Sequence, residues 1–388
     1  WSSNNKKIDE FIKNAQKSEK YYDKIIEWIP FERLSNIKPI GEGGFGIVYS
    51  ANWFDGKRKY LSENKKIKLT REEECKVALK GLKEGDFLEE FKASYECQLK
   101  KYSVEKYAIE TYGITFDPIN KKYMMVLEYA DKGVLREYIS KNFLKWEERI
   151  EILCSISDNL NHIHKQEICH RDLHSGNIIM TSVWDFKDLK ISIYPLGNRI
   201  VVVSQVSQDA KNKSNIEPKI IDLGFSRKIG DATDNKIFGI EDYIAPEILF
   251  GSAQNYTKAS DIYSLGVIML EMSIGKSSEL QPRFSSGGVQ NCAETSDIYG
   301  LVISEMSTRK SSELRLELPN CYKQLAERCM HKEPSKRPTA EELYNELQEW
   351  KGILKKEENE LDYKQRRIKL EFLNADKIDS VFSITLQE

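Results

Sequence analysis

The stretch that decides the fold is HRDLHSGN, which runs from His170 to Asn177 in a chain of 388 residues. It places a carboxylate, Asp172, five residues before a carboxamide, Asn177. An aspartate in such a loop can accept the proton of an attacking hydroxyl group, and an asparagine can coordinate a divalent metal. The loop follows residues 145–164, where a mostly apolar stripe at spacings of three and four predicts a long helix. The pattern therefore indicates a catalytic loop preceded by a helix.

Two more short motifs follow the loop in chain order. Residues 221–224 read IDLG and put a second acid, Asp222, after an apolar run, where its carboxylate can bridge a metal to phosphate groups. Residues 245–247 read APE and begin 23 positions after Asp222. Each string is short enough to arise by chance, but their joint appearance in this order makes chance a poor explanation.

Upstream, residues 41–48 match the pattern G-x-G-x-x-G-x-V. Glycines at these positions let the backbone approach phosphate groups closely, where a Cβ atom would collide. A dinucleotide-binding loop would open into a helix, whereas β-branched residues follow here, so residues 37–50 are predicted to form a hairpin. The loop then covers a nucleotide as a flap; a tight hairpin turn with no ligand is the alternative.

A lysine, Lys80, ends the short apolar run that begins at Val77, and this run is predicted to be a central strand. Burying a lysine is costly unless an anionic group accompanies it. Glu90, on the helix predicted to follow, is the proposed partner, and nucleotide phosphates would share the charge. Glu89 and Glu96 are the alternative partners.

Composition excludes several classes of protein. Lysine and arginine number 59 against 61 acidic residues, so the net charge of −2 gives no reason to expect binding to nucleic acid or to an anionic membrane. No stretch approaches the roughly 18–20 apolar residues of a membrane span. The polar N-terminus lacks the apolar run of a signal peptide, and its start at Trp1 suggests a fragment or a processed chain. Seven scattered cysteines are expected to be free thiols, and a cytoplasmic location is expected.

The order of patterns along the chain predicts two lobes, joined near residues 128–133. The first third is rich in predicted strands and the remainder in predicted helices. The expected divisions are an N-terminal extension (1–33), an N-lobe (34–129), a C-lobe (130–350) with an insertion at about 185–215 and an internal duplication (260–280 and 296–314), and a charged tail (351–388). Residues 57–74 are expected to be a solvated loop, and the tail a surface appendage.

Taken together, the glycine loop, the strand lysine, HRD, the DFG-like triplet and APE resemble the eukaryotic protein kinase family, from about Ile37 to Trp350. The wording of IIEWIPFERL, MMVLEYA and HRDLHSGN is similar to the tyrosine-kinase-like branch, in expanded fungal families. The resemblance implies an α+β, two-lobed fold, with a small N-terminal antiparallel β-sheet lobe carrying one helix and a larger, mainly α-helical C-terminal lobe.

The same resemblance implies a role for each matching residue, with ATP and Mg²⁺ as cofactors and a protein as substrate. The catalytic set, in which Asp172 is the base, is Asp172, Lys80, Glu90, Arg171 and Asn177. The ATP-binding set is Gly41, Gly43, Gly44, Phe45, Gly46, Val48, Ala78, Lys80, Leu127 (the gatekeeper position), Glu128 and Ala130. The metal ligands are Asn177 and Asp222. The oligomeric state stays open.

The resemblance also implies three supporting roles. Asp261 would brace the catalytic loop from a central helix, which the first copy of the duplication is favoured to form. Glu247 would form a buried ion pair with Arg337. Arg171 would bind a phosphate added to the activation loop at Thr233, or second at Ser226.

Three departures from the family pattern matter for function. Leu223 replaces the usual phenylalanine of the triplet. His174 stands where serine/threonine kinases carry a lysine, and residues 239–242 lack the threonine that would contact that lysine. These absences leave the hydroxyl specificity of the kinase open, with serine or threonine favoured over tyrosine. A pseudokinase that binds nucleotide or partners is the main alternative, while APE and Arg337 count against a small-molecule phosphotransferase.

Overall fold

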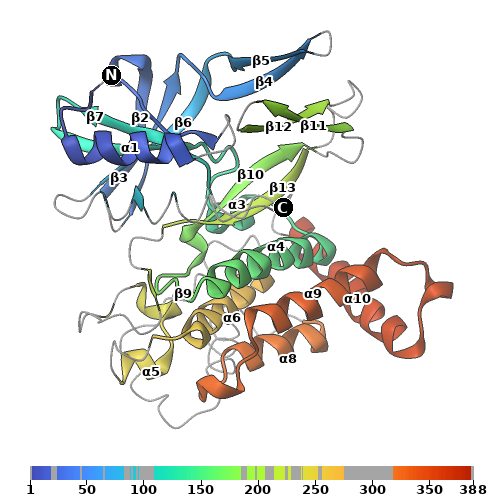
Figure 1. Ribbon diagram of the computed structural model, residues 1–388. Helices are drawn as coiled ribbons and strands as arrows, with labels where there is room; N and C mark the ends of the chain where they lie inside the picture. The colour runs from blue at the N-terminus through green and yellow to red at the C-terminus, as the bar shows by residue number, and fades with distance from the viewer. Residues whose placement is uncertain are drawn as a thin grey trace. The chain divides into compact units, whose positions relative to one another are not determined.

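The computed structural model divides the chain into two compact units, residues 1–131 with 181–216 and residues 132–180 with 217–388 (Figure 1). Each unit is described by itself. The residues that the structure describes are 2–18, 24–43, 46–63, 66–82, 88, 91–92, 95, 109–184, 190–196, 199–205, 214–222, 226–228, 237, 239–251, 256–274 and 318–385.

The first unit is built on a six-stranded sheet with the order β1-β7-β8-β6-β3-β2. The two edge strands differ, because β1 pairs parallel to β7 whereas every other neighbouring pair is antiparallel. The strands are β1 (Glu27–Trp28), β2 (Leu34–Gly43), β3 (Gly46–Trp53), β6 (Cys75–Gly81), β7 (Thr111–Asp117) and β8 (Lys122–Glu128). The hairpin and the central strand expected from sequence are therefore confirmed.

Alternation along the central strands divides the apolar side chains between two faces of this sheet. Val77 and Leu79 of β6 pack on one face, together with Trp53 and Val126. Ala78 packs on the other face, in a cluster with strand residues and with buried side chains of the helix α1 (Lys6–Ser18). The sheet is thus a true middle layer, with apolar packing on both sides.

The helix α1 was not expected from the sequence. It buries Ile8 and Ile12 completely, and the ring of Phe11 meets those of Phe91 and Tyr95 edge-on at centroid distances of 5.5 and 5.9 Å. Figure 1 shows α1 in blue beside the sheet. Helix α1 lies within the N-terminal extension, residues 1–33, whereas the helical residues around Phe91 lie within residues 34–129, where one helix was expected.

The charged segment 57–74 is a second hairpin and not the solvated loop that was expected. Its strands β4 (Arg58–Glu63) and β5 (Lys66–Arg71) pair antiparallel. Arg58 and Arg71 both bond the carboxylate of Glu27, at 3.2 and 2.6 Å. Two arginines on one acid tie this hairpin to the start of the sheet.

The expected insertion at 185–215 contains a further hairpin, with strands β11 (Lys190–Leu196) and β12 (Arg199–Gln205). On either side of it, β10 (Ile178–Trp184) pairs with β13 (Ser214–Ile220). Because β10 and β13 pair with each other, the chain leaves the helical unit before the insertion and returns to it after the insertion at neighbouring positions.

The second unit is mainly helical, and its other elements are arranged around the helices α4 and α6. The whole stripe predicted on α4 is buried, which confirms that helix. The helices are α3 (Leu135–Lys141), α4 (Trp146–Lys165), α5 (Pro246–Leu249), α6 (Lys258–Ile274), α8 (Asn320–Cys329), α9 (Ala340–Lys355) and α10 (Tyr363–Thr385), with single-turn 3-10 helices and the short strand pair β9 (Ile168–Cys169) and β14 (Arg227–Lys228) between them. A strand-rich unit and a mainly helical unit together confirm the expected fold class.

The tail is not an appendage, because α10 belongs to the core of the helical unit. Phe372 is fully buried, with its ring centroid 5.7 Å from that of Trp146. Asp376 accepts a hydrogen bond from the backbone N–H of Trp146 at 2.8 Å, and Asp379 pairs with Arg149 at 2.9 Å. Charges dominate the sequence of this segment, but Phe372 and Ala375 are buried in the core of the helical unit.

Three other expectations, on the duplicated helix, the cysteines and membrane spans, can be compared with the described residues only. The first copy of the duplication forms α6, as favoured, while the second copy, 296–314, lies outside the described residues. The described cysteines are free thiols: Cys75, Cys154, Cys169, Cys321 and Cys329. None of the described helices combines the length and the apolar character that crossing a membrane requires.

Candidate active site

One fully buried carboxylate, that of Asp261 on α6, holds the start of the catalytic loop by hydrogen bonds. Its Oδ2 accepts the backbone N–H of His170 at 2.8 Å and lies 2.9 Å from Nε2 of His164, and its Oδ1 accepts the N–H of Arg171 at 3.0 Å. Burial acts to raise the pKa of Asp261, but the hydrogen bond from His164 and the other donors outweigh it and hold this pKa below its ordinary value. The carboxylate stays charged and fixes the start of the loop.

Two residues of the site adopt a backbone conformation that is uncommon without glycine. Arg171 has φ +70° and Asp222 has φ +68°. Strained backbone of this kind persists only where surrounding bonds determine it, and it concentrates at functional sites. Here the N–H of Ile221 donates to the carbonyl of Asn177 at 2.9 Å, and Nε2 of His170 donates to the carbonyl of Ile221 at 2.9 Å. These bonds place Asp222 directly beside the catalytic loop.

Asp172 and Asn177 are joined by their side chains. Nδ2 of Asn177 donates to the backbone carbonyl of Asp172 at 2.9 Å and to its Oδ2 at 3.1 Å. Because the amide nitrogen faces Asp172, the amide oxygen points to the other side and is available as a ligand. An amide oxygen with the carboxylate of Asp222 is a hard oxygen donor pair, which suits Mg²⁺ that completes its shell with phosphate and water. The donor set therefore fits the implied ion.

A second buried network holds the other end of the loop. Ser175 and Tyr243 donate their hydroxyl protons to the two oxygens of Glu271, at 2.8 and 2.7 Å. Arg136 on α3 reaches Tyr243 at 3.1 Å and lies 3.4 Å from the Glu271 carboxylate. Burial, with Glu271 nearby, raises the pKa of Tyr243 well above its ordinary value, so the phenol remains a donor.

Sequence reasoning missed this network. Ser175 lies inside the HRDLHSGN motif, whose other members carry the predicted roles, and Tyr243 lies two residues before the APE motif. The signal that could have found it is Glu271, an acid within the otherwise apolar run of α6, since a buried carboxylate needs partners.

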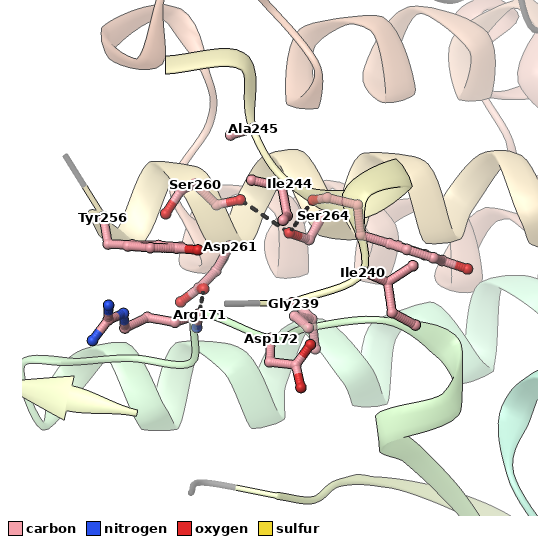
Figure 2. Close-up of a pocket in the computed structure, with 12 residues that line it drawn as sticks. Arg171, Asp172, Gly239, Ile240, Ile244, Ala245, Tyr256, Ser260, Asp261 and Ser264 are labelled. Atoms are coloured by element: carbon pink, nitrogen blue, oxygen red, sulfur yellow. Dashed lines mark hydrogen bonds between the residues drawn. The ribbon is translucent and has the colours of Figure 1, made fainter. Parts of the chain in front are cut away.

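A small pocket lies beside the catalytic loop, with all of its walls in the second unit (Figure 2). Arg171, Asp172, residues 239–240 and residues 243–245 line it together with the first half of α6. A Cβ atom added at Gly239, whose φ is +111°, would stand 3.4 Å from Oδ1 of Asp172. The pocket therefore borders the carboxylate that the sequence assigns as the base.

The predicted ion pair between Glu247 and Arg337 is present and bidentate. Both bonds measure 2.7 Å, the Arg337 side chain is fully buried, and the same guanidinium also donates to the carbonyl of Ala259 at 2.9 Å. A fork-to-fork pair of this kind is among the stronger charge-assisted arrangements. It joins the APE segment to the start of α6.

Four of the residues predicted to bind the nucleotide lie on one face of the sheet in the first unit. Ala78 lies opposite Leu127 in the ladder, and Val48 lies opposite Lys80. Directly opposed residues of antiparallel strands share a face, and so do residues two apart on one strand. These four side chains therefore line the same face, where Val48, Ala78 and Leu127 belong to one apolar cluster.

The remaining predicted residues fall at the ends of strands or outside the described part. Gly43 pairs with Gly46 at the tip of the glycine hairpin, next to the pair of Gly41 with Val48, and the φ of +106° at Gly46 favours glycine. Glu128 ends β8 and Ala130 follows it, half-buried. The predicted residues outside the described range are Gly44, Phe45, Glu89, Glu90, Glu96, Leu223 and Thr233.

Arg171, predicted to bind a phosphate, lies against an aromatic ring. Its guanidinium carbon is 4.4 Å from the centroid of Tyr256, and the two side chains lie side by side in Figure 2. Ser226, the second predicted acceptor, donates to the carbonyl of His170 at 3.3 Å.

A strand-rich unit with a glycine hairpin, and a helical unit whose HRD loop is braced by a buried aspartate, define the class of protein kinases. Comparison with protein families agrees. Residues 34–347 match the family model described as the protein kinase domain, so this chain belongs to the protein kinase family.

The curated relatives are distant. A probable serine/threonine-protein kinase, zyg-1, of Caenorhabditis briggsae is 29% identical over 62% of this chain and 26% of its own length. A probable leucine-rich repeat receptor-like protein kinase of Arabidopsis thaliana is 25% identical over 81% of this chain and 29% of its own length. A probable serine/threonine-protein kinase of Dictyostelium discoideum is 27% identical over 58% of this chain and 11% of its own length. The chain thus spans under a third of each of these relatives.

Proposed function

We propose that this chain transfers the γ-phosphoryl group of Mg·ATP to a serine or threonine hydroxyl of a protein substrate. The observation that carries the proposal is the joined set Asp172, Asn177 and Asp222, held by the buried brace of Asp261. Phosphoryl transfer to a hydroxyl group needs a carboxylate base close to two oxygen ligands for a metal ion.

In the proposed mechanism, the Asp172 carboxylate accepts the proton of the substrate hydroxyl. The hydroxyl oxygen then forms its bond to the γ-phosphorus, while the bond from that phosphorus to the ADP oxygen breaks and ADP keeps the electron pair. Asn177 and Asp222 would hold Mg²⁺, which when bound neutralises charge on the phosphates. Lys80, paired with Glu90, would orient the α- and β-phosphates.

The finer assignments belong to the same proposal. The preference for serine or threonine is supported by relatives whose names carry that specificity. Placement in the tyrosine-kinase-like branch rests on the wording of three strings, at residues 25–34, 124–130 and 170–177. Residues 34–129 and 130–350 are proposed as the two kinase lobes, with 41–48, Ala78 and 127–130 around the nucleotide.

The test is transfer of labelled γ-phosphate from Mg·ATP to the chain itself and to generic protein substrates. Replacing the base by Asp172→Asn should lower kcat by about 10²–10⁴-fold, because general base catalysis is lost while phosphate positioning remains. ATP affinity, measured by calorimetry, should stay within about twofold. The labelled residues, identified by mass spectrometry, should be serine and threonine.

A matched control is Asp362→Asn, which makes the same chemical change at a residue whose side chain accepts the backbone N–H of Gln365 at the start of α10. Its activity should equal that of the wild type. Wild-type activity in Asp172→Asn would overturn the base assignment. A folded wild-type chain that binds ATP without transferring phosphate would favour the pseudokinase alternative.

A further inference from the structure

His174 stands two residues after Asp172, and the mechanism above gives it no task. Its Nδ1 accepts the backbone N–H of Gly176 at 3.1 Å. A ring nitrogen that accepts a hydrogen bond carries no proton, so the proton of the neutral ring is on Nε2. Nε2 lies 3.5 Å from Oδ1 of Asp172. The protonated nitrogen of the imidazole therefore lies close to the carboxylate of the proposed base, slightly beyond the distance of an ordinary hydrogen bond.

Two neighbours fix the plane of this ring. A Cβ atom added at Gly176 would stand 2.9 Å from both Cε1 and Nδ1 of His174, so only glycine leaves room for the ring where it lies. On another side the ring packs against Tyr243, with centroids 5.8 Å apart and planes inclined at 51°. Tyr243 is in turn bonded to Glu271. The imidazole is thus held by its surroundings and not only by its own bond to the backbone.

The carboxylate of Asp172 meets a different neighbour at each oxygen. Oδ2 accepts Nδ2 of Asn177 at 3.1 Å, whereas Oδ1 faces Nε2 of His174. The contact of 3.5 Å is longer than an ordinary hydrogen bond, as is common at catalytic groups before a substrate is bound. A donor at each oxygen would fix the plane of the carboxylate once the contact at Oδ1 shortens to a hydrogen bond, whereas Asn177 alone would leave the plane free to tilt.

We propose that His174 is a positioning residue, whose Nε2–H orients the Asp172 carboxylate toward the substrate hydroxyl. This inference rests on the proposed role of Asp172 as the base. Burial above all, with Arg136 and His170, lowers the pKa of His174 to about 4, against the opposite influence of Asp222. At neutral pH the ring is uncharged. A neutral donor lowers the basicity of a carboxylate less than a cation in the same place, so the base keeps its strength.

The first test compares two substitutions of similar size. His174→Leu removes the N–H and should lower kcat about 10–50-fold, because misplacing a catalytic group by about 1 Å can cost up to 10²-fold. His174→Gln supplies an amide N–H of similar reach and should recover activity to within about fivefold of the wild type. ATP affinity should stay within twofold in both variants, so that the loss appears in kcat.

The matched control is His331→Leu. Nδ1 of His331 accepts the backbone N–H of Glu333, two residues on, at 3.0 Å, which repeats the local arrangement of His174 and Gly176 at a place with no role in the proposed mechanism. Its kcat should equal that of the wild type. If His174→Leu matched this control while Asp172→Asn was inactive, the positioning role would be overturned and the base assignment would stand.

A double-mutant test asks whether His174 acts through Asp172. In the Asp172→Asn background, His174→Leu should cause no further loss, since residues that work as a unit are not additive. Gly176→Ala should lower kcat several-fold by displacing the ring, but should have no effect in a His174→Ala background. Independent, multiplicative losses in either cycle would overturn the inference.

A readout that does not depend on turnover is the ¹⁵N NMR spectrum of the imidazole. The Nε2–H tautomer should be observed for His174 in the wild type, and its Nε2 resonance should shift in Asp172→Asn. The opposite tautomer, or equal loss of activity, ATP affinity and melting temperature in both the Leu and Gln variants, would assign His174 a structural role only. Absence of phosphate transfer by the wild-type chain would overturn the proposed function, and this inference with it.

Discussion

The two ends of α6 hold the same catalytic loop in different ways. Near its start, Asp261 accepts two backbone N–H groups, those of His170 and Arg171. Ten residues later, Glu271 accepts two side-chain hydroxyl groups, those of Ser175 and Tyr243. Asp261 therefore binds backbone groups of the loop, whereas Glu271 binds side-chain hydroxyl groups.

The difference teaches which parts of the loop tolerate change. Backbone donors are present whatever side chains occupy the loop, so the brace at Asp261 survives substitutions at the residues it binds. The network at Glu271 exists only with a hydroxyl at each of two positions, and with Arg136 near the carboxylate. The first brace gives the loop its shape, and the second links the loop to the segment before α5.

The largest effect in this comparison is expected for Asp261→Asn. One amide oxygen would have to serve three donors, and the new NH₂ group would face a buried backbone N–H. Stability should fall by about 3 kcal/mol, because buried donors to a charged group lose their acceptor. The kcat should fall at least about 100-fold, measured beside urea unfolding.

Asp117→Asn is the control for that variant. Asp117 is buried and likewise accepts backbone N–H groups, from Ile119 and Asn120, but it belongs to the strand-rich unit and not to the unit that contains the catalytic loop. It should lose stability with little change in kcat. Equal loss of kcat in the two variants would mean that Asp261 acts only through general stability.

A smaller effect is expected for Glu271→Gln. The amide keeps one acceptor, so one of the two hydroxyl groups loses its partner and Arg136 loses a counter-charge. The cost should be about 1–2 kcal/mol in urea unfolding, with kcat lowered about threefold to tenfold. A loss as large as that of Asp261→Asn would contradict the distinction between the two braces.

The smallest effect is expected from pH. The pKa of Asp261 is lower in the folded state than in the unfolded chain, so the unfolded chain takes up this proton first as pH falls. The stabilisation is fully present above the ordinary aspartate pKa of about 4 and is lost below it. The stability advantage of the wild type over Asp261→Asn should therefore shrink between about pH 5 and pH 3. An advantage that did not change with pH would contradict this account.

Local patterns were enough to predict much of the fold and of the site. The helix α4, the glycine hairpin and the central strand β6 followed from short motifs or from periodicity, and the pair of Glu247 with Arg337 followed from the resemblance to protein kinases. Each of them depends on residues close in sequence or on a recognisable string. What was missed depends on distant partners: the helix α1 on Phe91 and Tyr95, and the burial of α10, which was expected at the surface, on Trp146.

The sequence by itself determined the chemistry of this protein, because the acid, amide and glycine positions of the motifs follow from residue type and order. Only the tertiary structure decided how those groups are oriented. Asp261 and Glu271 reach the loop across about 90 residues of chain, and no local pattern reveals which donors they meet. The direction of the His174 ring likewise depends on the absence of a Cβ at Gly176 and on the ring of Tyr243, which only packing brings together.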